Sequence, residues 1–266
     1  MIRSFRKQWL RWRKQYERKA FRIYQDSFKV IAQNIPWSNL TESTYKINIE
    51  FNVTERQIVD AYVLAYRQIG VIHGKRTGLK INRQINKKNF TLDWFISNFE
   101  RSIISWLLEN GGQRITSVRS TFISYLNEII ATGINDGKSI SEIATEIQKH
   151  IRSRSFYRNN ALMIARTETT TAANYAATIA SETSGVLMDK VWVSSIDNRT
   201  RRRPEDEFDH VEMNGVRVPL SEPFIVGGEE MMFPGDPKGS AGNTINCRCT
   251  VAQVVRRDSL GNIIFT

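Results

Sequence analysis

The two cysteines of this 266-residue chain stand two positions apart, in the segment Asn246–Thr250 at the start of a predicted strand. Residues i and i+2 of an extended segment point to the same side, so the sulfurs of Cys247 and Cys249 are expected to face one way. A disulfide between them would close a tight, strained ring, and a cytoplasm disfavours it. Two convergent thiols are half of a tetrahedral zinc site.

Further ligands for such a site would have to come from elsewhere in the chain. His210 is one of only three histidines and the only one in the C-terminal part, so it is the candidate third ligand, and Asp197 or a water is the candidate fourth. Zinc would also explain how a segment rich in Pro and Gly stays ordered, because bound metal contributes folding energy. Against it, Cys-x-Cys with one distant His is not the spacing of a two-plus-two zinc motif, and free cysteines are commonly small buried hydrophobes. Both interpretations stay open.

Two other groups of charged residues could carry chemistry. The arginines of Asp197–Arg203 could bind phosphate or carboxylates, but the acidic residues that follow them favour a charge-compensated loop. In the helix expected before this loop, Arg166 or Glu168 could pin the loop-rich segment by charge-assisted hydrogen bonds. The chain has no Ser/His/Asp order, Walker loop, HExxH or GxGxxG. We therefore predict no catalytic residue, no enzyme, and no cofactor besides the possible zinc.

The element that opens the chain is predicted to be a helix over residues 3–31. Its aromatic side chains recur at helical steps and form one stripe, with members Phe5, Trp9, Trp12 and Tyr16. Such a stripe has to be buried, and packing on the chain's own body or on a partner is favoured over a membrane.

Positive charge is concentrated in the same helix. The chain holds 38 Lys+Arg against 27 Asp+Glu, a net charge of +11, and residues 1–31 contribute ten basic and two acidic side chains to it. A basic end on a nearly neutral body indicates contact with an acidic surface, although a solvated basic helix is the plain alternative. The candidate residues for binding nucleic acid or a partner are Arg3, Arg6, Lys7, Trp9, Arg11, Trp12, Arg13 and Lys14.

Further helices are predicted from their capping residues. Residues 54–57 form a capping box that begins a helix to about Ile72, before a loop at Gly74 and Gly78. Helices are also predicted over 91–108, 114–131, 139–150 and 156–184, and strands over 190–196, 216–218 and 250–255. Residues 34–52 read as a connector with a short strand at Tyr45–Phe51.

These elements predict an α+β fold, with a mainly α-helical N-terminal two-thirds followed by a small, loop-rich, β-containing C-terminal segment. The predicted organisation is a basic aromatic helix and connector over 1–52, a helical region over 53–138 and a C-terminal domain over 139–266. No apolar run approaches the roughly 18 residues that a membrane-spanning helix needs, so no membrane span is expected.

Six short motifs follow one another through the C-terminal part: Ala165–Thr169, Lys190–Trp192, Asp197–Arg201, His210–Gly215, Phe233–Pro237 and Ile245–Cys249. In this order and spacing they resemble the C-terminal domain of tailed-phage minor head proteins, the Mu protein F-like or SPP1 head-morphogenesis family. The resemblance covers about residues 140–255. The family usually places its His a few residues after Arg-Thr-Arg, whereas Arg202–Asp209 intervenes here, so His210 is expected on a longer loop.

This resemblance implies a minor head (capsid) structural protein of a tailed bacteriophage, made in the host cytoplasm and located in the virion head near the portal. Its implied role is to assist head morphogenesis and DNA packaging or delivery. The implied partners are the portal protein and other head proteins, with packaged double-stranded DNA as a non-specific partner. The alternative is a virion-carried metal-dependent enzyme, a nuclease or transferase injected with the DNA, that would use Asp197, His210 and the cysteines.

Overall fold

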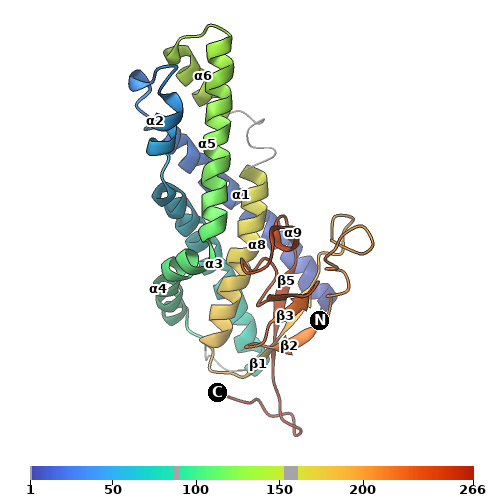
Figure 1. Cartoon of the computed structure of the whole chain (residues 1–266). Helices are drawn as coiled ribbons and strands as arrows, with labels where there is room; N and C mark the ends of the chain where they lie inside the picture. The colour runs from blue at the N-terminus through green and yellow to red at the C-terminus, as the bar shows by residue number, and fades with distance from the viewer. Residues whose placement is uncertain (1, 87–89, 153–160) are drawn as a thin grey trace.

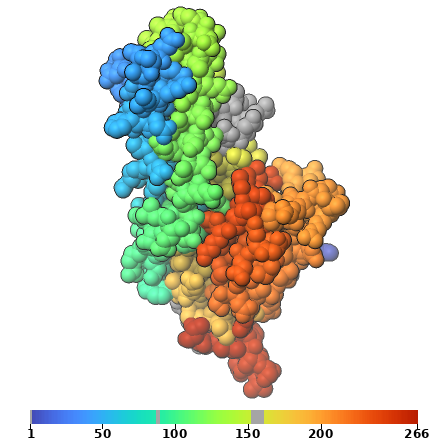
Figure 2. Space-filling view, viewed as in Figure 1, coloured from blue at the N-terminus to red at the C-terminus, as the bar shows by residue number. Residues whose placement is uncertain are grey.

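The computed structural model describes residues 2–86, 90–152 and 161–266 of the chain. Long helices form an elongated body, and short strands and loops from the C-terminal part pack on one side of it, at the end where the N-terminus lies (Figure 1). This confirms the predicted α+β fold, with helices first and a small β-containing segment last. In the space-filling view the C-terminal part forms one mass against the helices (Figure 2).

The helical part begins with α1 (Ile2–Gln33), as predicted, and a short 3-10 helix η1 (Trp37–Asn39). The predicted strand at Tyr45–Phe51 is wrong, because this segment is the helix α2 (Tyr45–Asn52). Apolar side chains at alternate positions are compatible with a strand, but in a helix Tyr45 and Ile49 share one face, four residues apart. That face is buried, while Phe51 is 81% exposed.

The helix α3 (Glu55–Ile85) begins at the predicted capping box, where Thr54 Oγ1 accepts a hydrogen bond from the Gln57 amide. Its predicted end near Ile72 is wrong, because the helix continues through the glycines that were expected to form a loop. Gly70, Gly74 and Gly78 lie one turn apart on one face of the helix, and aromatic rings occupy the space that side chains would take there. These glycines serve close packing and not chain reversal.

The other helices follow the predicted ranges closely. They are α4 (Leu92–Asn110), α5 (Gly112–Asn135), α6 (Ile140–Arg152) and α8 (Leu162–Glu182), with a short α9 (Ala241–Thr244) between strands. At the start of α6, the Ser139 amide donates to Glu142 Oε2 and the Glu142 amide donates to Ser139 Oγ, which is the predicted second capping box. Residues 156–160 of the predicted helix 156–184 lie outside the described residues.

The three predicted strands form one antiparallel sheet in the order β2-β1-β5, with β1 (Met188–Val193), β2 (Arg217–Pro219) and β5 (Thr250–Val255). Lys190 of the central strand pairs with Val218 on one side and with Gln253 on the other. The sequence did not indicate β3 (Phe224–Val226) and β4 (Glu229–Met231), which pair as a separate hairpin. Both lie in a stretch rich in Pro and Gly that was expected to be loop.

One large cluster of buried apolar side chains extends from Trp9 of α1, through the long helices, to Cys247 and Val251. The helix α8 packs along α3 and also against α1 and β5, so it lies between the helical body and the sheet. The division into segments 1–52, 53–138 and 139–266 stays a prediction. None of the described helices is long and apolar enough to span a membrane.

Candidate metal centre

The structure brings His210, Cys247 and Cys249 together. Nδ1 of His210 lies 3.7 Å from Sγ of Cys247 and 3.7 Å from Sγ of Cys249. The two cysteines are 2% exposed and the histidine 1%. Among the described residues, these three form the group of His, Cys, Asp and Glu side chains that could hold a metal ion.

The orientation of the His210 ring is set by a chain of hydrogen bonds. Its Nε2 lies 2.7 Å from Oδ1 of Asn243, which can only accept, so Nε2 carries the proton and Nδ1 presents a lone pair to the two sulfurs. Nδ2 of Asn243 in turn donates to Oε2 of Glu229 and to the carbonyl of Val226. Metal-bound histidines commonly donate their second ring nitrogen to such a partner.

Polar side chains of α8 form hydrogen bonds with the backbone of the cysteine segment. The Thr170 hydroxyl donates to the Cys247 carbonyl at 2.7 Å, and the Asn246 amide donates to the Thr167 hydroxyl. Asn174 accepts from the Val251 amide and donates to the Pro234 carbonyl, so it joins β5 to the loop that contains Pro234. Sequence reasoning missed these residues. A signal was present, since Thr and Asn are poor choices for a helix interior unless their side chains are needed.

The helix α1 also contacts the cysteine segment. Trp9 Nε1 donates at 2.7 Å to the carbonyl of Arg248, the residue between the two cysteines, and the Ser195 hydroxyl donates to the same oxygen. Arg6 donates to the carbonyl of Ser194 and to the side chain of Asn214. The N-terminal helix therefore helps to position the candidate centre.

The two thiols titrate as a pair. A hydrogen bond with the Cys249 thiol lowers the pKa of Cys247 to about 7. The same pairing, together with burial, raises the pKa of Cys249 well above its usual value. A pKa of about 7 makes the Cys247 thiolate accessible near neutral pH, and thiolate is the form that ligates metal.

Asp197, the candidate fourth ligand, is not part of this group. Its Oδ1 accepts hydrogen bonds from the Thr200 hydroxyl and from the Arg199 amide, so it closes a turn after β1. Arg201 lies 3.5 Å from Asp206, which fits the expected charge-compensated loop.

The eight N-terminal candidate residues divide between two faces of α1. Trp9 and Arg13 are buried, Arg6 is half-buried in the contacts described above, and Trp12 is half-buried under the Arg76 guanidinium at 4.7 Å. The aromatic stripe thus packs on the chain's own body, one of the two expected placements. The others, Arg3, Lys7, Arg11 and Lys14, are exposed.

The sequence suggested that Glu168 could pin the loop-rich segment. In the structure Glu168 instead faces the helices. It accepts a 2.6 Å hydrogen bond from the Tyr66 hydroxyl and lies 3.6 Å from Arg114, at one side of a cavity of about 430 Å³. Burial raises the pKa of this carboxyl. Arg114 in turn donates to the Gly235 carbonyl, so this arginine connects α5 to the loop that contains Gly235.

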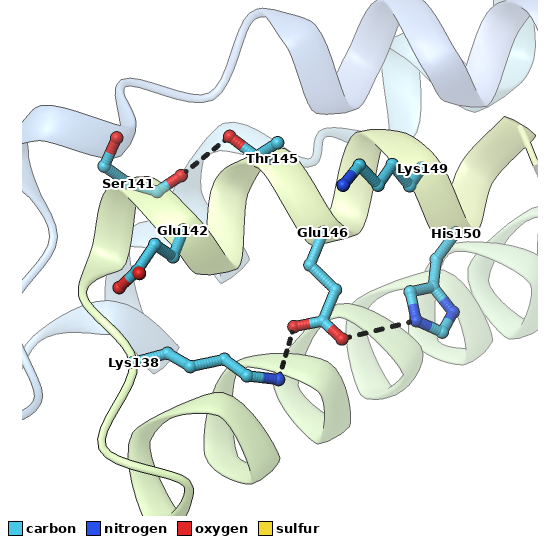
Figure 3. Close-up of a pocket in the computed structure, with 7 residues that line it drawn as sticks. All are labelled: Lys138, Ser141, Glu142, Thr145, Glu146, Lys149 and His150. Carbon is cyan, nitrogen blue, oxygen red and sulfur yellow. Dashed lines mark hydrogen bonds and ion pairs between the residues drawn. The ribbon is translucent and has the colours of Figure 1, made fainter.

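A second hollow, of about 490 Å³, lies on α6 at the opposite end of the molecule from the strands (Figure 3). Its charged side chains pair with one another: Glu146 lies 2.9 Å from Lys138 and 3.7 Å from His150. Such mutual pairing is typical of a solvated helix surface, so the candidate site remains the buried His/Cys group.

Comparison with known proteins agrees with the family that the motifs suggested. The model of the family described as phage Mu protein F like protein matches residues 125–252, which include α8, β1 to β4, the start of β5 and the three candidate ligands. The chain carries a Mu protein F-like domain. The match begins within α5, earlier than the predicted segment 139–266. The resemblance found in the motifs is thereby confirmed.

Two curated proteins are similar to this chain. An NAD(+)–arginine ADP-ribosyltransferase, EFV, of Enterococcus faecalis is 32% identical over 149 residues, which are 54% of this chain and 28% of that protein. Uncharacterized protein YqbB of Bacillus subtilis is 25% identical over 160 residues, 59% of this chain and 50% of that protein. The chain thus spans half or less of these relatives. No solved structure matches.

Proposed function

We propose that this Mu F-like protein is a minor head protein of a tailed bacteriophage, located in the virion near the portal vertex, that assists head morphogenesis and DNA packaging or delivery. The observation that carries the proposal is the Mu F-like domain over residues 125–252. The portal protein, other head proteins and packaged DNA are the proposed partners.

A structural role is favoured over the alternative of a virion-carried metal-dependent nuclease or transferase. A catalytic metal keeps one coordination position open to substrate. Here the side chains that could hold a metal are at most 2% exposed. Side chains of α1 and α8 donate to the backbone of the cysteine segment, and the Trp192 ring of β1 lies edge-on to His210. The Enterococcus protein is named as a transferase, but the region aligned with this chain makes up only 28% of it. Its name is therefore weak support for an enzyme here.

The outer face of α1 supports the proposed contact with DNA. Six exposed cationic side chains recur along it at steps of four, four, three, four and four residues, so they form one stripe opposite the aromatic one. The stripe spans about 28 Å at 1.5 Å per residue. A row of cations binds the phosphate backbone without reading sequence. The members of this basic stripe are Arg3, Lys7, Arg11, Lys14, Arg18 and Arg22.

Replacing Arg3, Lys7, Arg11 and Lys14 by Gln tests this contact. We expect the affinity for random-sequence duplex DNA to fall by at least tenfold. The dependence of log K on log salt should become shallower by up to about 0.9 for each phosphate that the variant no longer neutralises. Fluorescence anisotropy over a range of salt concentrations measures both.

The matched control removes four exposed cations elsewhere, by Lys46→Gln, Arg56→Gln, Arg101→Gln and Lys149→Gln. It changes the net charge equally, so an equal loss of affinity in both variants would mean that only total charge matters. The role in the head is tested separately, by co-purification of the full chain with the portal protein of the same phage. A chain that never enters particles would contradict the proposed location.

A further inference from the structure

We infer that His210, Cys247 and Cys249 bind one zinc ion, which ties the loop-rich C-terminal part together. With Zn–S bonds of about 2.3 Å and Zn–N bonds of about 2.0–2.1 Å, two ligands at a tetrahedral angle lie about 3.5–3.6 Å apart. The two Nδ1–Sγ separations are both 3.7 Å. The side chains are therefore already spaced to hold such an ion between them.

The surroundings of the three side chains favour a metal over a plain apolar contact. If the cysteines were only small hydrophobes, the ring nitrogen that faces them would not need a fixed tautomer. Instead, Asn243, which is buried, and Glu229, which is half-buried, form a relay that leaves the Nδ1 lone pair directed at both sulfurs. Two sulfurs and one imidazole are a donor set that suits zinc, whereas magnesium and calcium prefer oxygen.

The fourth position of the ion is not supplied by a further His, Cys, Asp or Glu of the described residues. We assign it to an oxygen ligand, a water or a backbone carbonyl. The three ligand side chains are at most 2% exposed, so the ion they bind would lie in the protein interior. The geometry therefore points to a structural ion and not to one that turns over a substrate.

The ion would connect segments that regular hydrogen bonding leaves apart. His210 lies on the long loop between β1 and β2, and the cysteines lie just before β5, so an ion bound to all three closes this loop-rich stretch. Thr170 and Trp9 then attach the same stretch to α8 and α1. Bound zinc is expected to raise the stability of the whole chain, since a site formed only in the folded state adds its binding energy to folding.

Elemental analysis of the full-length protein, purified without chelator and with zinc in the medium, tests the inference. We expect about one zinc per chain, and less than a tenth of that in the variant carrying Cys247→Ser and Cys249→Ser. Replacement of the metal by Co²⁺ should give the intense visible absorption of a tetrahedral site and a sulfur-to-metal charge-transfer band in the ultraviolet. A control variant, His150→Gln, changes a histidine at the distant end and should keep full metal content.

A second variant keeps the inference testable if the cysteine variant fails to fold. Asn243→Ala leaves all three ligands in place but removes the partner of Nε2, and loss of such an outer partner typically weakens metal binding about 10–100-fold. Competition with a chromogenic chelator measures this. Folded wild-type chain that carries no zinc and takes up neither Zn²⁺ nor Co²⁺ would overturn the inference and leave the proposed head function untouched.

Discussion

At the scale of single residues, His73 is a buried histidine surrounded by aromatic side chains, away from the candidate metal centre. It lies on α3, 1% exposed, with its Nδ1 3.3 Å from the Tyr16 hydroxyl and with the rings of Trp9 and Trp12 edge-on to its own. Burial lowers its pKa to about 3, and the positive charges of Lys80 and Arg76 act in the same direction. The folded chain therefore holds this imidazole neutral.

Lowering the pH should destabilise the protein through His73. In the unfolded chain the imidazole binds a proton below a pKa of about 6.5, whereas the folded chain excludes that proton until about pH 3, so stability is lost as the pH falls through this window. The slope from one such group is about 1.4 kcal/mol per pH unit. Urea unfolding at pH 7 and pH 5 measures it. His73→Phe should flatten the dependence, and an unchanged slope would show that other groups cause it.

At the scale of elements, the contact between α3 and α4 depends on residues without side chains. A Cβ added at Gly74 would lie 2.0 Å from the Phe95 ring, and one added at Gly70 would lie 2.1 Å from the Phe99 ring. The segment before α4 repeats this pattern, with Phe90 against Gly78. Removal of Cβ atoms lets aromatic rings lie directly on the helix backbone, so the packing gained compensates the poor helix propensity of three glycines.

Gly74→Ala should destabilise the chain by about 1–3 kcal/mol, because the ring of Phe95 has to move out of a packed core. The matched control is Gly112→Ala at the start of α5, where an added Cβ meets nothing within 4 Å. There we expect no loss, or a gain of up to about 1 kcal/mol from better helix propensity. Chemical denaturation of both variants makes the comparison. Equal effects at the two positions would contradict the packing argument.

At the scale of the whole molecule, the first helix and the last strands share one core. The hydrogen bond from Trp9 to the Arg248 carbonyl joins residues 239 positions apart in the chain. Arg6 and Gln84 make similar contacts from the helices to the C-terminal part. The helical body and the Mu F-like domain are therefore expected to unfold together.

Trp9→Ala should lower the stability of the entire chain by about 3–5 kcal/mol, the usual cost of removing a buried tryptophan ring. Far-ultraviolet circular dichroism reports the helices and near-ultraviolet signals report the packed aromatic rings, and both should shift to the same lower melting temperature. Trp94→Ala, at a residue 53% exposed, serves as the control. Two separate transitions in the wild-type chain would instead support independent units such as 1–52, 53–138 and 139–266.

Features that depend on neighbouring residues were accessible from the sequence alone. The capping boxes at Thr54 and Ser139, the amphipathic first helix and the strands of the main sheet follow from short-range periodicity and local hydrogen bonds, and each is present. The family followed from six ordered motifs, and the shared direction of the two thiols followed from strand geometry.

Features that depend on distant partners were decided only by the tertiary structure. The same alternation of apolar residues at Tyr45–Phe51 permits a strand or a helix, and packing against the body selected the helix. The role of the α3 glycines became clear only from the phenylalanine rings that pack on them. Around His210, the structure places Asn243 as the hydrogen-bond partner and leaves Asp197 outside the candidate metal group. Local sequence encodes periodicity and caps, but which side chains meet across a core depends on the path of the whole chain.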